Sequence, residues 1–194
     1  IWPWSPGYAP QMETLQQRYG IEKGSVISAV DLIKGIGTYA GLRPIAVQGA
    51  TGLFDTNYQG KCDAAIKALT DEDFVFLHIE APDEAGHEGD VALKIRTIED
   101  LDKYVVGPIL DWAIACNYMT VISSPPVSIA LLPDHPTPCD RRTHTNAPVP
   151  VTIYNPYISA DAVSSFNEQS VRKGALGTIP EGKFMDLFMG KTVK

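Results

Sequence analysis

The sequence contains little that is typical of a membrane, secreted or nucleic-acid-binding protein. No apolar run reaches the roughly 20 residues that a membrane-spanning helix needs, and no signal-peptide pattern opens the chain. Lysine and arginine total 16 against 23 aspartates and glutamates, which gives a formal net charge of −7 over 194 residues. Because the basic residues form no cluster, nucleic acid and anionic membranes are not expected as partners.

Cysteine is also scarce. Cys62, Cys116 and Cys139 are odd in number and show no CxxC spacing, which favours a reducing cytoplasm over a disulfide framework. Cys139 is interpreted as a small apolar filler. What remains is ordinary for a globular protein, with 44% hydrophobic and 20% charged residues, and the length suffices for one substantial domain. Oligomeric state and metal identity are not encoded in these numbers.

Apolar runs of strand type alternate with helical patterns along the chain. Strands are expected at 25–30, 43–48, 74–80, 127–132 and 149–154, and helices at 31–41, 56–69 and 91–112, with short helices over 161–190. Segment 117–126 is compatible with either an edge strand or a loop. The alternation predicts an α/β fold, a three-layer sandwich in which helices cover both faces of a mostly parallel sheet.

Two of the expected helices carry predictions about their buried faces. In 56–69 the inward positions are expected to be Ala64, Ala65, Ala68 and Leu69. The pattern after residue 90 predicts one buried stripe, interrupted by a kink at Gly107–Pro108. Its members are Val91, Ile95, Ile98, Leu101, Val105, Ile109 and Trp112.

Ligand-type side chains stand at the ends of three expected strands. Asp83 and His87 fall in an expected loop after strand 74–80, Asp134 and His135 follow strand 127–132, and His144 precedes strand 149–154. Functional groups gather beyond the carboxyl ends of strands in α/β sheets. Taken singly, each Asp–His group also fits a capping aspartate beside a solvated histidine, and His144 fits an ordinary loop histidine. His78, inside an apolar strand, is interpreted as a hydrogen-bonded core histidine.

Taken together, the five residues predict a site for divalent metal. Carboxylates and imidazoles without thiolates suit Mn²⁺, Zn²⁺ or Mg²⁺. Five ligands exceed the needs of one three-ligand zinc ion and fit two metals that share a site. Such a pair can hold the attacking and leaving oxygens of a phosphoryl displacement.

Several motifs resemble those of one family. "APDEAGHEGD" (81–90), "LPDHPTP" (132–138) and "RTHTNAPVP" (142–150) together resemble the cofactor-independent phosphoglycerate mutases of the archaeal-type branch, within the alkaline phosphatase superfamily. "SAVDLIKGIG" (28–37), "GATGLFDTNYQGK" (49–61) and the opening "IWPWSPG" are similar to that branch too. The resemblance covers nearly the whole chain and implies an alkaline phosphatase-like core.

The resemblance also implies a mechanism and a set of roles. Asp83, His87 and His144 match the ligands of one metal, and Asp134 and His135 match two ligands of the other. The family passes a phosphoryl group to a serine and back to bound glycerate. This interconverts 3-phosphoglycerate and 2-phosphoglycerate in glycolysis without bisphosphoglycerate. Two divalent ions, Mn²⁺ or alternatively Zn²⁺ or Mg²⁺, a small phosphorylated acid as substrate and a cytoplasmic location are therefore expected.

The sequence departs from the family pattern at its nucleophile. No N-terminal aspartate motif is found, and no serine has the expected surroundings; those considered are Ser25, Ser28, Ser123, Ser124 and Ser128. The family's inserted substrate domain is not recognised either. Residues 1–194 are therefore expected to be the C-terminal part of a longer chain and inactive alone. Alternatives are a related phosphatase, a phosphonate-processing enzyme, a homoserine kinase-like phosphotransferase, or a non-catalytic metal-binding module.

Three cationic residues are candidates for contact with an anionic substrate. Lys34 lies in "DLIKGIG", and Arg141 and Arg142 lie beside His144. Ammonium and guanidinium groups bind phosphate and carboxylate well. The alternative interpretation of all three is that they are solvated surface charges.

Overall fold

The computed structural model describes residues 7–118 and 126–191, so most of segment 117–126 lies outside the described residues, as do Ser123 and Ser124. The chain divides into two compact units, residues 1–80 and 81–194. Each unit is described by itself. None of the helices in the described part of the chain is long and apolar enough to cross a membrane.

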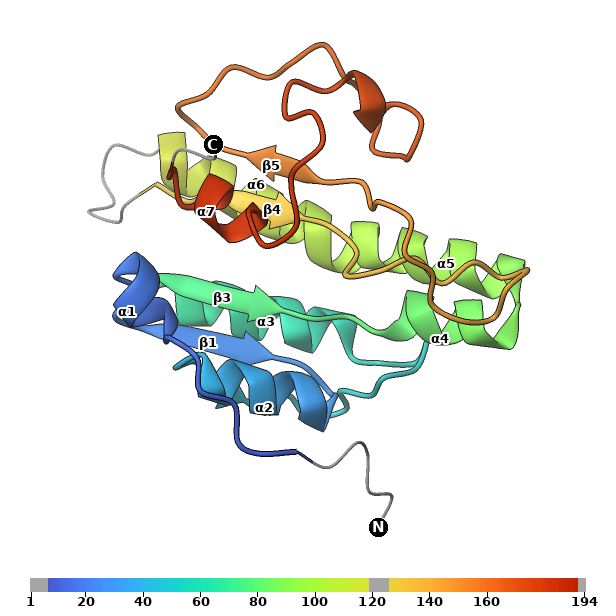
Figure 1. Ribbon diagram of the computed structural model, residues 1–194, viewed down its shortest axis with the longest axis horizontal. Coiled ribbons are helices and arrows are strands. Elements are labelled where there is room, and N and C mark those ends of the chain that lie inside the picture. Colours follow the sequence, from blue (N-terminus) through green and yellow to red (C-terminus); the bar gives the residue numbers. More distant parts are fainter. Residues whose placement is uncertain (1–6, 119–125, 192–194) are drawn as a thin grey trace. The chain divides into compact units, whose positions relative to one another are not determined.

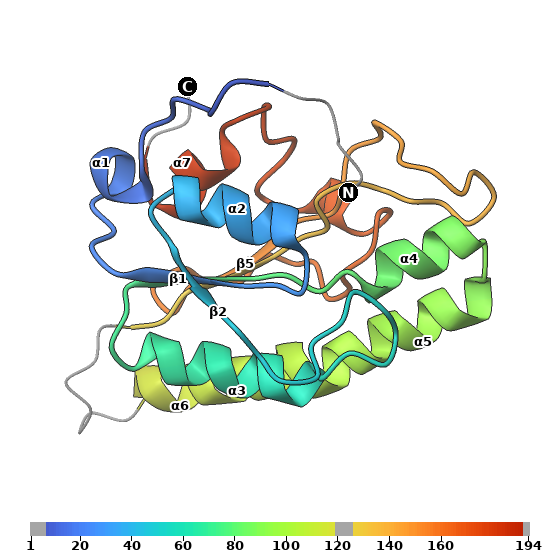
Figure 2. The same cartoon turned by 90° about the horizontal axis from the view of Figure 1, so that it is seen from below.

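The first unit is built on a parallel sheet with the strand order β2-β1-β3. The chain moves from β1 to β2 through one helix and then passes back over β1 to β3 through another. Because such crossovers are right-handed, opposite directions of travel place the two helices on opposite faces of the sheet, as Figure 2 shows for α2 and α3. The elements are α1 (Leu15–Tyr19), β1 (Gly24–Ile27), α2 (Asp31–Tyr39), β2 (Arg43–Ile45), α3 (Tyr58–Leu69) and β3 (Phe74–Leu77).

This arrangement confirms the expected α/β fold and the strands expected at 25–30, 43–48 and 74–80, each of which ends sooner than predicted. Val26 and Ile27 of β1 are almost completely buried. Gly37 allows α2 to approach β1 closely, since a β-carbon at this position would lie 2.6 Å from Val26 Cγ1. The residues of the sheet's middle strand thus form the core of the unit.

The buried face of α3 agrees only partly with the prediction. Ala65 and Ala68 are buried as expected, and Ala64 and Leu69 are half-buried. The rest of the face was not anticipated, since it contains Tyr58, Lys61 and Cys62. Lys61, with 1% exposure, is the charged exception among the buried residues of this helix. The three cysteines are described, and none is joined to another by a disulfide.

The second unit contains a long helical region and a short antiparallel pair of strands (Figure 1). The expected strands 127–132 and 149–154 are present in shortened form, and the short helices expected in the tail are found. The elements are α4 (Ala81–Glu88), α5 (Val91–Leu101), a π-helical turn (Asp102–Val106), α6 (Gly107–Tyr118), β4 (Ile129–Leu131), β5 (Thr152–Tyr154), a 3-10 turn (Val171–Lys173) and α7 (Phe184–Phe188).

A π-helical turn interrupts the long helix over Asp102–Val106, directly before the predicted kink at Gly107–Pro108. The Gly107 N–H donates to the Asp102 carbonyl, five residues back, which makes this turn π-helical. Pro108 follows and has no N–H to donate, and a single turn inside an α-helix is the form in which π-helix mostly occurs. At the far end, the Asn117 side chain joins α6 to the strand pair, because it bonds both backbone groups of Val127 and the Tyr154 hydroxyl.

The predicted buried stripe is wrong for the first half of this helix. Val91, Ile95 and Ile98 are 58%, 54% and 50% exposed, whereas Thr97 and Val105 are buried. Helix α5 packs against α4, and that contact, not the apolar period, determines which side faces inward. An i, i+4, i+7 spacing identifies a common face but not the direction in which it points.

Candidate metal centre

Helix α4 places Asp83 and His87 on one face. The sequence predicted a loop here, and that prediction is wrong, since both residues lie within Ala81–Glu88. Pro82 in the first turn and acidic residues beside it favour the start of a helix. Residues four apart are neighbours on a helix surface, and His87 Nε2 lies 3.3 Å from Asp83 Oδ2.

A folded loop after β4 brings the remaining candidates together. The Thr145 N–H donates to the Pro136 carbonyl over 3.0 Å, and the N–H groups of Arg141 and Arg142 both donate to the Pro138 carbonyl. These bonds return the chain to its starting point, so that the rings of His135 and His144 lie with their centroids 3.7 Å apart. Local backbone hydrogen bonds therefore create this half of the site.

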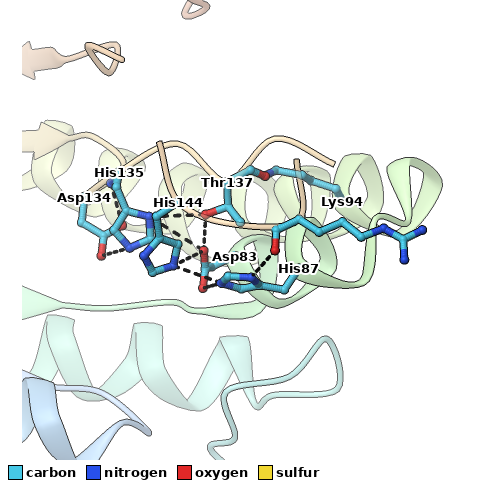
Figure 3. Close-up of polar contacts among 8 residues, drawn as sticks. Asp83, His87, Lys94, Asp134, His135, Thr137 and His144 are labelled. Carbon is cyan, nitrogen blue, oxygen red and sulfur yellow. Dashed lines mark hydrogen bonds and ion pairs between the residues drawn. The ribbon is translucent and has the colours of Figure 1, made fainter. Parts of the chain in front are cut away.

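Three ligand atoms converge on one point (Figure 3). His87 Nε2 lies 3.0 Å from His144 Nε2 and 3.3 Å from Asp83 Oδ2, and His144 Nε2 lies 3.5 Å from Asp83 Oδ1. Three atoms bound to one metal at about 2.1 Å, with angles of about 90–109°, are about 3.0–3.4 Å apart. The observed spacing therefore fits a bound divalent cation.

The orientation of His87 supports the same conclusion. Its Nδ1 lies 3.0 Å from the Arg142 carbonyl oxygen. A carbonyl only accepts, so Nδ1 carries the hydrogen and Nε2 keeps a lone pair for a metal. Arg142 directs its carbonyl in this way from a left-handed conformation with φ 54°, which is uncommon for a residue other than glycine.

Asp134 and His135 form a second, smaller group. Asp134 Oδ2 lies 3.3 Å from His135 Nε2, a spacing that again suits two ligands of one ion. His135 Nδ1 is 3.9 Å from Asp83 Oδ1, so the two groups adjoin (Figure 3). The structure thus brings together all five residues that the sequence singled out, as a group of three and a neighbouring pair.

Each of the three candidate substrate-binding residues lies close to another residue of its own unit. Lys34 lies in the first unit, where its Nζ is 2.7 Å from Asp31 Oδ1 and lowers the pKa of that carboxyl. The Arg141 side chain is 71% exposed, and its Nε lies 3.9 Å from Asp140 Oδ2. The Arg142 guanidinium lies against Gly89 at the end of α4. A role for these three residues in substrate binding stays a prediction.

Sequence reasoning missed the residues that support the ligands. Thr137 donates a hydrogen bond to Asp83, and Lys94 donates one to the Thr137 carbonyl. The backbone role of Arg142 was missed too. A threonine two positions after His135 was a usable signal, because outer hydrogen-bond partners of metal ligands are a regular feature of metal sites.

Residues 1–191 match the family described as the metalloenzyme superfamily. The chain belongs to the metalloenzyme superfamily. Membership implies that it binds divalent metal, which agrees with the donor set just described. Among curated relatives, the 2,3-bisphosphoglycerate-independent phosphoglycerate mutase of Methanosarcina mazei is 51% identical over 180 residues, which are 92% of this chain and 43% of that protein.

Solved structures confirm the fold. A protein from Pyrococcus horikoshii matches with a TM-score of 0.81 at 32% identity, over 95% of this chain and 54% of its own. The cofactor-independent phosphoglycerate mutase of Thermoplasma acidophilum matches with a TM-score of 0.67 over 93% of this chain and 39% of its own; at 23% identity this likeness shows the fold alone. The chain spans less than half the length of the curated relatives it matches.

Proposed function

We propose that this chain is the metal-binding part of a cofactor-independent phosphoglycerate mutase, which interconverts 3-phosphoglycerate and 2-phosphoglycerate in glycolysis. One observation carries the proposal: His87, His144 and Asp83 direct ligand atoms to one point at separations of 3.0–3.5 Å. The name of the Methanosarcina mazei relative supports the choice of reaction. A cytoplasmic location and a small phosphorylated acid as substrate belong to the same proposal.

The ligands divide between two ions. Asp83, His87 and His144 hold one ion, and Asp134 and His135 supply two ligands to the other. An aspartate and the serine nucleophile, both outside these 194 residues, complete the second site. Mn²⁺ is the proposed metal, with Zn²⁺ and Mg²⁺ as alternatives, since oxygen and nitrogen ligands without thiolate suit all three. Bisphosphoglycerate is not required.

The chain's own residues orient the metal ligands and bind the substrate. A bound pair of divalent ions supplies positive charge beside the phosphoryl oxygens during transfer. The Arg142 carbonyl keeps the hydrogen of His87 on Nδ1, so that Nε2 is available as a ligand. Helix α4 holds Asp83 and His87 at a fixed separation. Lys34, Arg141 and Arg142 are proposed to bind the anionic groups of the substrate.

The test replaces a candidate metal ligand in a full-length protein, one that contains this chain and has the length of its relatives. We expect His87→Ala to lower the Mn²⁺-dependent formation of 2-phosphoglycerate from 3-phosphoglycerate by more than about 100-fold, because losing even an outer partner of a ligand costs up to that much. His78→Ala serves as the matched control. Wild-type activity in His87→Ala would contradict the proposal.

Further assays separate the alternatives, because the metal site does not specify the acceptor. Phosphate release from a generic phosphate ester without mutase activity would favour a phosphatase. Cleavage of a phosphonate would favour a phosphonate-processing enzyme, and ATP-dependent phosphorylation of homoserine would favour a homoserine kinase-like phosphotransferase. Mn²⁺ binding with no turnover of any of these substrates would favour a non-catalytic metal-binding module.

A further inference from the structure

The Thr137 hydroxyl lies between the two groups of candidate ligands. Its Oγ1 donates to Asp83 Oδ1, a member of the group of three, and lies 3.3 Å from His135 Nδ1, a member of the pair. Figure 3 shows the Thr137 hydroxyl between these two side chains. The threonine contributes no ligand atom itself, yet it contacts a residue from each group.

The roles in these two hydrogen bonds are fixed by chemistry. A hydroxyl has one hydrogen and two lone pairs. Its hydrogen is directed to the Asp83 carboxylate, which accepts only, so Oγ1 receives the hydrogen of His135 Nδ1. His135 therefore keeps the lone pair on Nε2, the atom that lies 3.3 Å from Asp134 Oδ2. The same hydroxyl thus orients a carboxylate and selects an imidazole tautomer.

The surroundings hold Thr137 in this position. The residue is only 3% exposed, and its carbonyl accepts a hydrogen bond of 2.5 Å from Lys94 Nζ on α5. Gly86 of α4 makes the close approach possible, because a β-carbon there would collide with the Thr137 carbonyl oxygen. Two helices therefore fix the backbone whose hydroxyl reaches the ligands.

We propose that Thr137 is a positioning residue that orients Asp83 and His135 together and so builds the ligand sets of both metal ions as one unit. This inference rests on the proposed function, since it takes the five residues as metal ligands. It predicts that loss of the Thr137 hydroxyl weakens the binding of both ions, although none of the ligands themselves is removed.

The experiment measures Mn²⁺ binding to the chain by calorimetry. Thr137→Val keeps the shape and removes the hydroxyl, and we expect Mn²⁺ affinity to fall by about 10–100-fold, the usual effect of losing an outer partner of a ligand. Thr137→Ser restores the hydroxyl and should restore most of the affinity. Thr97→Val is the matched control, because Thr97 is also buried and its hydroxyl, as far as the described residues go, donates only to the Lys94 carbonyl in its own helix.

A second readout examines the tautomer without metal. Nitrogen NMR of neutral His135 should show the hydrogen on Nδ1 in the wild type and in Thr137→Ser, and a loss of that preference in Thr137→Val. Wild-type chain that binds Mn²⁺ while Thr137→Val binds it equally well would overturn the inference and leave the proposed function standing. Wild-type chain that binds none of Mn²⁺, Zn²⁺ and Mg²⁺ would overturn both. A hydrogen on Nε2 in the wild type would overturn the inference whether or not Thr137→Val folds.

Discussion

The two units of the molecule place histidines in contrasting surroundings. In the first unit, Ser28 Oγ accepts the Val30 N–H over 3.0 Å and lies 3.2 Å from His78 Nδ1. In the second unit, His87 Nε2 and His144 Nε2 face each other at 3.0 Å with a carboxylate beside them. A hydroxyl and an imidazole satisfy each other with one hydrogen bond, whereas His87 Nε2, which keeps its lone pair, and the Asp83 carboxylate together offer acceptors to a cation.

The comparison teaches that the partners of a histidine, and not its place in the sequence, indicate its role. His78 follows the end of β3 directly, whereas His87 lies in the last turn of α4, the helix that comes next in the sequence. Their surroundings differ because a hydroxyl, that of Ser28, lies beside the first, while a carboxylate and a second imidazole, those of Asp83 and His144, lie beside the second. His78 thus has a hydrogen-bond partner, as the sequence predicted.

The largest effect is expected when His87 and His78 are replaced in turn, which tests whether their roles differ. We expect His87→Ala to weaken Mn²⁺ binding to the chain by more than about 100-fold, since a ligand itself is lost. His78→Ala should leave Mn²⁺ affinity unchanged and cost only about 1 kcal/mol of unfolding free energy, the usual value of one hydrogen bond. Calorimetric titration with Mn²⁺ and urea denaturation measure the two effects. Equal losses of Mn²⁺ affinity in both variants would remove the distinction between the two regions.

Gly86 in the second unit and Gly35 in the first allow the packing of the two units to be compared by the same substitution. Gly86→Ala forces a β-carbon against the Thr137 carbonyl and is expected to destabilise the chain by about 1–3 kcal/mol, as overpacking does. Gly35 of α2 is exposed, and no heavy atom in the described part of the chain lies within 4 Å of a β-carbon built there. Gly35→Ala should therefore stabilise by about 0.5–1 kcal/mol.

Urea denaturation of the metal-free chain measures both glycine effects on one scale. Since both variants add the same methyl group to a helix, each serves as the control for the other. If Gly86→Ala also stabilised the chain, the close approach of the loop to α4 would not be a real constraint.

The sequence was sufficient to single out the candidate residues that the structure brings together, and to predict the alternation of strands and helices. Asp83, His87 and His144 were recognisable because ligand-type residues at three strand ends are a chemical pattern that survives errors in secondary structure. The loop expected around Asp83 is a helix, yet the pair of ligands stayed together, since an i, i+4 spacing brings residues close on a helix too. Pro82 and the acidic first turn were signals for that helix.

Other features of the structure depend on tertiary contacts, and the spacing of apolar residues along a helix does not reveal these contacts. The apolar spacing of Val91, Ile95 and Ile98 is correct for one face of a helix, but the contact with α4 turned another face inward. Thr137 reaches Asp83 across more than fifty residues of sequence, and no local pattern links the two. Lys61 was missed because burial of a lysine contradicts the general rule for charged residues.

Lys61 provides the smallest expected effect and a test of how the first unit handles a buried charge. Its Nζ lies 3.3 Å from the Thr51 carbonyl oxygen, and burial lowers its pKa although the nearby Glu80 carboxylate opposes this. Between the lowered value and the ordinary pKa of 10.5, the unfolded chain holds a proton that the folded chain has released. Stability contributed by this group therefore rises with pH across that interval. Lys61→Met should lose the rise.

The measurement compares unfolding free energies of the wild type and Lys61→Met in urea, from neutral pH up to about pH 10. Burial raises the pKa of the neighbouring Cys62 thiol, which gives a slope of opposite sign, but Cys62 is present in both proteins and cancels in their difference. Lys67→Met removes an exposed lysine from the same helix and reports the effect of lost charge alone. A difference between wild type and Lys61→Met that did not change with pH would mean that the buried ammonium is fully compensated by Thr51 and Glu80. The first unit would then satisfy its charges as completely as it satisfies His78, and the contrast with the converging acceptors of the second unit would be greater.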